Sequence, residues 1–210
     1  RYIEILTDFE DRNIDILVGT QMITKGLDFD NVSVVGILSA DNMISFPDFR
    51  SFERSFQQMT QVSGRAGRHG RRGKVIIQTY NPYHQVIRDV IDNNYFSMYK
   101  SQITERRVFR YPPFYKLIRI TIRHKDEHVV NEVADFLAAN LRQVFGNRVL
   151  GPEYPSVSRI RNLYLKNIQI RFEKSEAIAQ AKKIIIDISN NICNQKQYSK
   201  LSIIHDADPV

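Results

Sequence analysis

Residues 60–68 read Thr-Gln-Val-Ser-Gly-Arg-Ala-Gly-Arg, and the rest of the chain is best interpreted around this stretch. Arg65 and Arg68 lie three residues apart, and Gln61 lies four residues before the first arginine. A guanidinium group carries a permanent charge and a planar fork of donors that suits phosphate oxygens. The neighbouring glycines keep side-chain bulk away from a ligand. The stretch therefore predicts an anion site formed by Gln61, Arg65 and Arg68.

Upstream of this site, apolar residues recur at the spacing of one helix face. They are Phe49, Phe52, Phe56, Met59 and Val62. The pattern predicts a buried amphipathic helix whose C-terminal end places the two arginines beside the anion.

Short apolar runs in the first half of the chain predict an α/β domain with a mostly parallel sheet. The expected strands are 15–19, 32–38 and 74–80. The expected helices besides the one above are 3–12, 84–93 and 95–107, with a turn at 41–47. Ligands of such sheets bind outside the carboxyl ends of the strands. The loop at 20–30 follows the first strand and is a second candidate site.

Two consecutive prolines, Pro112 and Pro113, predict a domain boundary near 105–113, so that residues 1–107 and 108–210 form separate domains. The expected strands of the second domain are 115–124, 162–172 and 200–205, its expected helices are 127–144 and 175–191, and 151–158 is expected to be irregular. The apolar stripe of its first helix is expected to contain Val129, Val133, Phe136, Leu137, Leu141 and Val144. This order predicts a small ferredoxin-like α+β domain, whose open sheet face would carry Arg119 and Arg123.

The composition is that of a soluble globular protein with one or two domains, at 42% hydrophobic and 25% charged residues over 210 positions. No apolar run approaches the about eighteen residues that a transmembrane helix needs. The single cysteine, Cys193, excludes an internal disulfide and a multi-cysteine metal site within this chain, and it favours a cytoplasmic location. The first residue is Arg rather than Met, so we expect a fragment of a longer protein.

The net charge of +7 lies in the second half of the chain. Residues 104–174 contain 14 Lys and Arg against 7 Asp and Glu, and the remaining residues contain 16 of each kind. This excess predicts a surface that faces a polyanion, with a merely solubilising basic face as the alternative. Arg159 and Arg161 lie near Tyr154 and Tyr164 and are the best candidates for single-stranded nucleic acid. Lys166 and Arg171 are better explained as packed strand residues.

Two motifs in order resemble motifs V and VI of superfamily 2 helicases. They are GTQMITKGLDF at 19–29 and QVSGRAGR at 61–68. The intervening SADNMISFPDFRSFERSFQQMT, the segment from Gly151-Pro152 to Asn162 and the ending Asp206-Ala207-Asp208-Pro209 resemble more specifically the primosomal protein N′ family of replication-restart helicases. The resemblance covers residues 14–210.

The resemblance implies a catalytic role for the residues of the opening stretch. Arg68 matches an arginine finger that reaches the γ-phosphate of ATP, which a first RecA-like lobe holds with Mg²⁺. Arg65 and Gln61 match its partners at the same phosphate. Fingers of this kind are worth about 10³–10⁵ in rate.

The resemblance also implies roles for the loop at 20–30. Gly26 and Asp28 match positions that couple the nucleotide to DNA, with Asp28 on the nucleotide side. Thr20 and Gln21 match positions near the DNA backbone, and Lys25 can serve either side.

Taken together, the resemblance implies a partial second RecA-like lobe followed by a C-terminal domain of an ATP-dependent 3′-to-5′ helicase. Its implied partners are single-stranded and forked DNA, the acidic tail of single-strand-binding protein and primosome proteins. Zinc is implied for the parent protein and not for this chain. The sequence contains no GxxxxGK[ST] loop, and Asp126-Glu127-His128 is one residue short of a DExH box, so it is expected to begin a helix. We therefore expect the fragment alone not to hydrolyse ATP. The alternatives are another superfamily 2 repair translocase and a non-enzymatic nucleic-acid-binding module.

Overall fold

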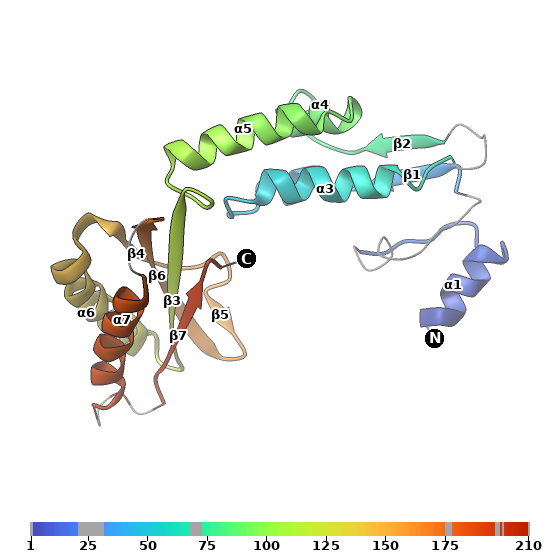
Figure 1. Cartoon of the computed structure of the whole chain (residues 1–210). Coiled ribbons are helices and arrows are strands. Elements are labelled where there is room, and N and C mark those ends of the chain that lie inside the picture. Colours follow the sequence, from blue (N-terminus) through green and yellow to red (C-terminus); the bar gives the residue numbers. More distant parts are fainter. Residues whose placement is uncertain are drawn as a thin grey trace. The chain divides into compact units, whose positions relative to one another are not determined.

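The computed structural model describes residues 2–20, 32–67, 73–174, 178–195, 198 and 200–209. These residues form a mixed α/β structure with two separate sheets (Figure 1). The chain divides into two compact units, an N-terminal unit of residues 1–103 and a C-terminal unit of residues 104–210.

The N-terminal unit combines two short parallel strands with several helices. Its elements are α1 (Tyr2–Glu10), β1 (Val34–Ile37), α2 (Ala40–Ile44), α3 (Ser51–Ser63), β2 (Lys74–Ile77), α4 (Gln85–Ile91) and α5 (Tyr95–Val108), the last of which continues into the C-terminal unit. The two strands pair from Val34 with Lys74 to Ile37 with Ile77. Parallel strands need a crossover between them, and here α2 and α3 provide it.

Helix α3 supplies much of the core of this unit, as its spacing predicts. Phe56 and Met59 are buried, and Phe52 and Val62 pack against the same core from its edge. The partners in the core are Ile37, Ala40, Ile44, Val86, Ile87, Val90 and Met98. The helix predicted from the apolar periodicity is therefore confirmed for Phe52, Phe56, Met59 and Val62, whereas Phe49 lies before its first residue.

Two predictions for the N-terminal unit are wrong. Residues 15–19 form no strand, and Ile16 and Val18 are 78% and 79% exposed. An apolar run becomes a strand only where a neighbouring backbone completes its hydrogen bonds, and within the described residues no strand pairs with this run. The predicted turn at 41–47 begins with the short helix α2, in which Ala40 and Ile44 are buried.

The C-terminal unit is an antiparallel sheet covered on one face by two helices. Its elements are β3 (Tyr115–His124), α6 (Glu127–Phe145), the 3₁₀ turn η2 (Gly146–Arg148), β4 (Val149–Glu153), β5 (Arg159–Ile160), β6 (Leu163–Glu173), α7 (Ile178–Cys193) and β7 (Ser202–Ala207). The strand order is β4-β6-β3-β7, and β5 also pairs with β6. Figure 1 shows α6 and α7 together on one side of this sheet.

The register of β3 against β6 assigns alternate residues to opposite faces of the sheet. Ile118, Ile120 and Ile122 are buried beneath the helices. Arg119 and Arg123 alternate with them and therefore lie on the face without helices, as the sequence predicts. The alternation of β3 separates the isoleucines beneath the helices from Arg119 and Arg123, and the buried Leu117 shares the face of the two arginines.

Helix α6 begins where the sequence predicts but buries a slightly different stripe. The Asp126 carboxylate accepts from the backbone N–H of His128 at 2.9 Å, so Asp-Glu-His is a capped helix start. Its buried residues are Val130, Val133, Ala134, Leu137, Ala138 and Leu141. Phe136 and Val144, predicted to be in the core, are 50% and 52% exposed. The two alanines take the core positions because a small side chain permits close packing of a helix on a sheet.

The segment predicted to be irregular at 151–158 partly belongs to the sheet. Gly151 lies inside β4 with φ +86°, and a Cβ there would lie 2.9 Å from the carbonyl oxygen of Asn167. Only glycine permits this close approach of two strands at a positive φ.

Candidate phosphate site and basic surface

The end of α3 presents Gln61 and Arg65 one helical turn apart. Gln61 is exposed in the last turn of the helix, and Arg65 is half-buried in the turn that follows. The backbone N–H of Gly64 donates to the carbonyl oxygen of Thr60, and the N–H of Arg65 donates to that of Val62. Side chains four positions apart lie on the same side of a helical segment, so the structure brings these two predicted site residues together.

The backbone after Arg65 is fixed by two glycines. Gly67 has φ +72°, and its N–H donates to the carbonyl oxygen of Val32, just before β1, at 3.0 Å. Gly73 precedes β2, and a Cβ there would lie 2.3 Å from the backbone of Ala66 and Gly67. The turn that carries Arg65 is therefore held against the amino-terminal ends of both strands.

The start of α3 is fixed by a pair of charges that was not predicted from the sequence. Arg54 Nη1 donates to Asp48 Oδ2 at 3.0 Å, and Asp48 Oδ1 accepts from the backbone N–H of Arg50 at 2.9 Å. The Asp48 side chain is only 10% exposed. In the sequence, the Pro-Asp-Phe-Arg run just before the helix indicates the turn that anchors α3.

A second carboxylate joins α2 to the segment after β2. Asp41 accepts from the Thr79 hydroxyl at 2.8 Å and from the Tyr80 backbone N–H at 3.1 Å. The Thr79 hydrogen bond is the main reason that the pKa of Asp41 lies below its ordinary value. Asp41 and Asp48 together hold the framework that positions Gln61 and Arg65.

Several predicted site residues lie outside the described residues. They are Gln21, Lys25, Gly26, Asp28 and Arg68. Thr20 is described and is exposed at the end of the unpaired run 15–20. The roles predicted for these six residues stay predictions.

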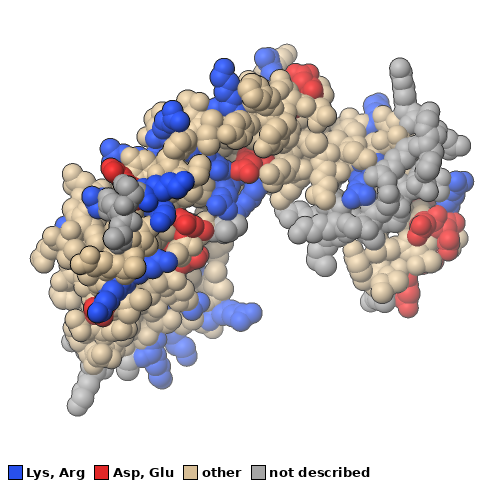
Figure 2. All heavy atoms as spheres, viewed as in Figure 1, with Lys and Arg blue, Asp and Glu red and all other residues tan. Residues whose placement is uncertain are grey.

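The positive charge of the protein belongs to the C-terminal unit. Residues 104–210 contain 18 Lys and Arg against 11 Asp and Glu, whereas residues 1–103 contain 12 of each. Figure 2 shows Lys and Arg side chains projecting from the surface of this unit. Such an excess on one unit is the electrostatic pattern expected of a polyanion-binding surface.

Arg159 and Arg161 lie on a hairpin made by β5 and the start of β6. The guanidinium carbon of Arg159 lies 4.9 Å from the centre of the Tyr164 ring, and Arg159 Nη2 donates to Asn162 Oδ1 at 3.2 Å. Arg161 is exposed in the turn between the two strands. The structure therefore brings the two predicted DNA-binding arginines together on one exposed element.

Lys166 and Arg171 are held in contacts within the unit. Lys166 Nζ lies 4.0 Å from Asp135 Oδ1, and its side chain is 12% exposed. Arg171 Nη1 donates to the carbonyl oxygen of Phe109 at 2.8 Å, and its guanidinium lies over the Tyr111 ring. Both residues pack as the sequence analysis expects.

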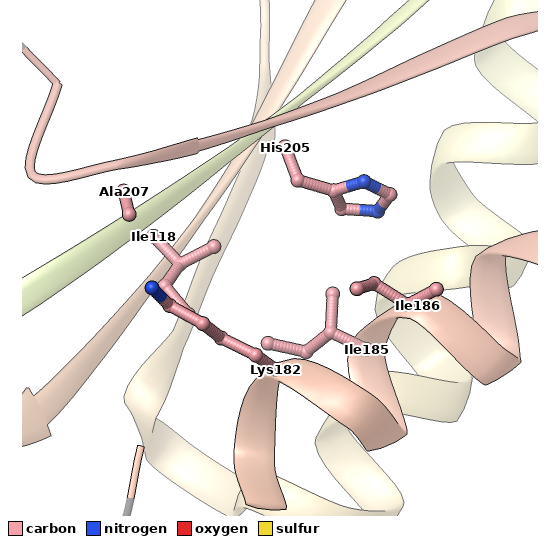
Figure 3. A pocket seen from close by; sticks show the side chains of 6 residues that line it. All are labelled: Ile118, Lys182, Ile185, Ile186, His205 and Ala207. Carbon is pink, nitrogen blue, oxygen red and sulfur yellow. The ribbon is translucent and has the colours of Figure 1, made fainter. Parts of the chain in front are cut away.

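A pocket of about 230 Å³ lies between α7 and β7. Figure 3 shows its lining, which consists of Ile118, Lys182, Ile185, Ile186, His205 and Ala207. His205 Nε2 lies 2.9 Å from Ser189 Oγ, and Ser189 donates its own proton to the Ile185 carbonyl oxygen. Desolvation at this position lowers the pKa of His205, so the ring is predominantly neutral at pH 7.

Within the described ranges, no group of three or more His, Cys, Asp or Glu side chains is placed to hold a metal ion. No helix among these same residues has both the length and the apolar character needed to cross a membrane.

Comparison with protein families assigns the two parts of the chain to a class. Residues 2–70 match the helicase conserved C-terminal domain. Residues 107–210 match the C-terminal domain of primosomal protein N. The chain therefore combines a helicase conserved C-terminal domain with a C-terminal domain of the primosomal protein N type.

Curated relatives place the chain within that class. Over 197 residues it is 40% identical to replication restart protein PriA of Bacillus subtilis (strain 168). The aligned region covers 92% of this chain and 24% of the relative. Over 208 residues it is 33% identical to replication restart protein PriA of Borreliella burgdorferi, which covers 96% of this chain and 31% of the relative. The chain belongs to the family of replication restart protein PriA. It spans about a quarter to a third of the length of these relatives.

Proposed function

We propose that the chain is the C-terminal part of a cytoplasmic, ATP-dependent 3′-to-5′ DNA helicase that restarts stalled replication forks and initiates primosome assembly. The observation that carries this proposal is the arrangement of Gln61 and Arg65 at the end of α3, in a chain of the PriA family. Both side chains offer hydrogen-bond donors on one side of a turn that is held in place by Gly67 and Gly73.

We further propose a partial second RecA-like lobe and a ferredoxin-like C-terminal domain. The parallel pairing of β1 with β2 across α2 and α3 supports the first assignment. The second is supported by the order β3-α6-β4-β6-α7-β7 together with the strand order β4-β6-β3-β7.

The donor set of the site fits the phosphate end of ATP. Arg65 is a permanent cation and favours an anion, and the side-chain amide of Gln61 can donate its N–H groups to the same anion. In the proposed mechanism Arg68 stabilises charge on the transferring phosphoryl group, and Arg65 and Gln61 hold the same phosphate. The ligands of Mg²⁺ and a Walker loop belong to a first lobe, because the 210 residues contain no such loop.

The nucleotide site is proposed to communicate with DNA through the loop at 20–30. Gly26 and Asp28 serve the nucleotide, and Thr20, Gln21 and Lys25 serve the DNA backbone. In the C-terminal unit Arg159 and Arg161 contact DNA, which the charge excess of that unit supports.

The proposed partners are single-stranded and forked DNA, primosome proteins and the acidic tail of single-strand-binding protein. An acidic tail is attracted to arginine-rich surfaces, and this attraction weakens with salt. Titration of the chain with a tail peptide at two salt concentrations checks the protein partner, and salt-independent or undetectable binding contradicts it.

The test of the proposed function is Arg68→Ala in the full-length parent protein. We expect ATP hydrolysis to fall by about 10³-fold or more, because the finger acts on the transition state. DNA affinity should change by less than about twofold, since Arg68 is assigned to the nucleotide. ATPase assays with single-stranded DNA and equilibrium DNA binding measure the two effects, with the 210-residue chain alone as the control without turnover. Retained hydrolysis by the variant, or turnover by the chain alone, refutes the assignment.

A further inference from the structure

Strand β7 forms an open edge of the C-terminal sheet. Within the described residues its strand neighbour is β3, and the register between them is continuous from Ser202 to Ala207 without a bulge. Natural proteins usually protect such edges with proline, lysine or a bulge. This stretch contains none of the three, and His205, Asp206 and Ala207 are exposed. The edge is therefore able to pair with another chain.

The hydrogen bonds at one end of β7 show which backbone groups face outward. The N–H of Asp208 donates to the carbonyl oxygen of Leu117 at 2.7 Å, so the backbone of Asp208 faces β3. Successive residues of an antiparallel strand direct their backbone groups to opposite sides. The N–H and carbonyl groups of Ile203, His205 and Ala207 therefore point away from β3. They form a row of alternating donors and acceptors, which is the pattern that an added strand requires.

The pocket between α7 and β7 lies beside this row (Figure 3). His205 and Ala207 line it from the strand, so their side chains lie on the face of the sheet that α7 covers. Residues directly opposite each other in paired strands share a face. The residue opposite His205 or Ala207 in an added strand would therefore hydrogen-bond to β7 and direct its side chain toward the pocket.

The lining of the pocket suits an aliphatic side chain with a carboxylate nearby. Isoleucine side chains from β3 and α7 supply the apolar wall, and Lys182 is the cation among the lining residues. The His205 ring is held in place, because its Nε2 lies 2.9 Å from Ser189 Oγ and Ser189 donates to the Ile185 carbonyl oxygen. A wall that is fixed in advance loses little conformational entropy on binding.

The chemistry of this edge favours an acidic peptide segment over other occupants. Residues 104–210 contain 18 Lys and Arg against 11 Asp and Glu, so two copies of the unit repel each other across a shared edge. A nucleic acid lacks the alternating amide groups that would pair with β7. A free carboxyl terminus is bound by a nest of backbone N–H groups, whereas donors and acceptors alternate here. An internal, extended segment therefore fits best.

We propose that the α7–β7 groove, which consists of this pocket and the open edge of β7, binds an internal, extended segment of a protein partner. The segment adds to β7 as a further strand, places an aliphatic side chain in the pocket and brings a carboxylate near Lys182. This inference goes beyond the proposed function and does not rest on the nucleotide or DNA sites, since none of the residues assigned to those sites lines the pocket.

The probe is an acetylated and amidated heptapeptide, Thr-Glu-Thr-Leu-Thr-Glu-Thr, added in molar excess to the 210-residue chain. A glutamate lies two residues to each side of the leucine, so a carboxylate shares the face of the leucine in either strand direction. Amide hydrogen exchange, measured by NMR, reports the pairing. We expect exchange at Ile203, His205 and Ala207 to slow by about tenfold or more. Exchange at Ile204 and Asp206 should stay unchanged, because these amides already face β3.

Matched peptides test the direction of the hydrogen bonds and the use of the pocket. N-methylation of the leucine removes an N–H that faces β7 and should weaken binding by about fivefold or more. N-methylation of the threonine that follows it removes an N–H that faces away from β7 and should change the affinity by less than about twofold. Replacement of the leucine by alanine should weaken binding by about tenfold or more, because it empties the pocket.

Lys182→Gln and Lys183→Gln form a matched pair of protein variants. Both lysines are exposed on α7, and of the two only Lys182 lines the pocket. Lys182→Gln should weaken peptide binding by about two- to fivefold, and Lys183→Gln should have less than about half that effect. The difference between the two variants should shrink at high salt, since salt screens an exposed ion pair.

Slower exchange at the outward amides of β7, dependent on the leucine N–H and on Lys182, supports the inference. Unchanged exchange at these amides, or equal binding of the two N-methylated peptides, overturns it. Tighter binding of the same peptide with a free carboxyl terminus also overturns it and indicates a site for a chain end.

Exchange that is already slow without peptide overturns the inference in favour of another occupant. If this protection rises with the concentration of the chain, a second copy covers the edge. If it occurs only in the full-length parent protein, another segment of the parent covers it. Each of these outcomes concerns the α7–β7 groove alone and leaves the proposed nucleotide and DNA roles unaffected.

Discussion

The two units of the chain differ in how completely they bury the apolar side chains of their sheets. In the C-terminal unit, Ile120, Val133 and Leu137 are fully buried between a five-stranded sheet and two helices. In the N-terminal unit, Val34 and Ile76 lie in a sheet that has two strands among the described residues, and they are 53% and 50% exposed. A two-stranded sheet has little stability of its own. The N-terminal unit is therefore held together by α3, α4 and α5, whereas the C-terminal unit has a complete sheet–helix core.

The largest expected effect comes from making the same substitution in both sheets. Ile120→Ala should reduce the free energy of unfolding of the C-terminal unit by about 2–5 kcal/mol, since it opens a cavity in a closed core. Ile76→Ala should cost about 0.5 kcal/mol or less, because half of that side chain already faces solvent. Urea denaturation of the two variants measures the difference, and each serves as the control for the other. Equal losses would show that the two cores are equally closed.

A smaller effect is expected at the start of α3. Asp48→Ala removes the carboxylate that accepts from Arg54 and from the Arg50 backbone, and leaves these donors poorly paired. We expect a cost of about 1–3 kcal/mol, confined to the N-terminal unit. Hydrogen exchange should accelerate in α3 and stay unchanged in α6.

The control for Asp48→Ala is Asp135→Ala in the C-terminal unit. Asp135 is 68% exposed and lies at the limit of ion-pair distance from Lys166, so its loss should cost about 0–1 kcal/mol. If Asp135→Ala proved as costly as Asp48→Ala, the importance assigned to the anchor of α3 would be wrong.

The same contrast explains which parts of the fold were predictable from the sequence. Strands β3, β6 and β7 and helices α6 and α7 follow from periodicity, because a sheet with one covered face produces alternation along most of β3. Strands β4 and β5 were not predicted. The run at 15–19 has the composition of a buried strand and still forms none, since pairing depends on another segment that composition does not specify. The predicted apolar stripe of α6 differs from the buried one. Phe136 is more hydrophobic than Ala134 and was therefore predicted to be buried, whereas close packing of the helix on the sheet favours the alanine.

The residues of the candidate site were predictable from the sequence, whereas the contacts that hold them in place were less predictable. Gln61 and Arg65 follow from a local pattern, and the structure places them one turn apart. The anchor at Asp41 depends on a partner that only the fold brings near, as Thr79 is 38 residues from Asp41. The anchor at Asp48 is local, because its partners lie two and six residues further along the chain. The turn at Arg161 has no local sequence signal, since arginine disfavours the φ of +49° that it adopts there.

The smallest expected effect concerns pH and again separates the units. Burial lowers the pKa of His205 below its ordinary 6.5, so the unfolded chain binds this proton more readily than the folded chain. The contribution of neutral His205 to stability is complete above the unfolded pKa and is lost as pH falls from about 6.5 through the folded pKa. Asp41 has a lowered carboxyl pKa, so its contribution is lost only at more acidic pH, below its ordinary 3.8.

Acidification from pH 7.5 to 5.5 should therefore weaken the C-terminal unit through His205 and leave the contribution of Asp41 intact. The expected loss is about 0.5 kcal/mol or less, because part of the imidazole remains in contact with solvent, which screens the effect. His205→Gln keeps a side-chain donor near Ser189 and cannot titrate, so it should remove this pH dependence. Urea midpoints at the two pH values, for the chain and the variant, measure it. An unchanged pH dependence in His205→Gln would mean that another group of the C-terminal unit titrates in this range. The His205 ring would then not be the reason that the C-terminal unit loses more stability in acid than the N-terminal unit.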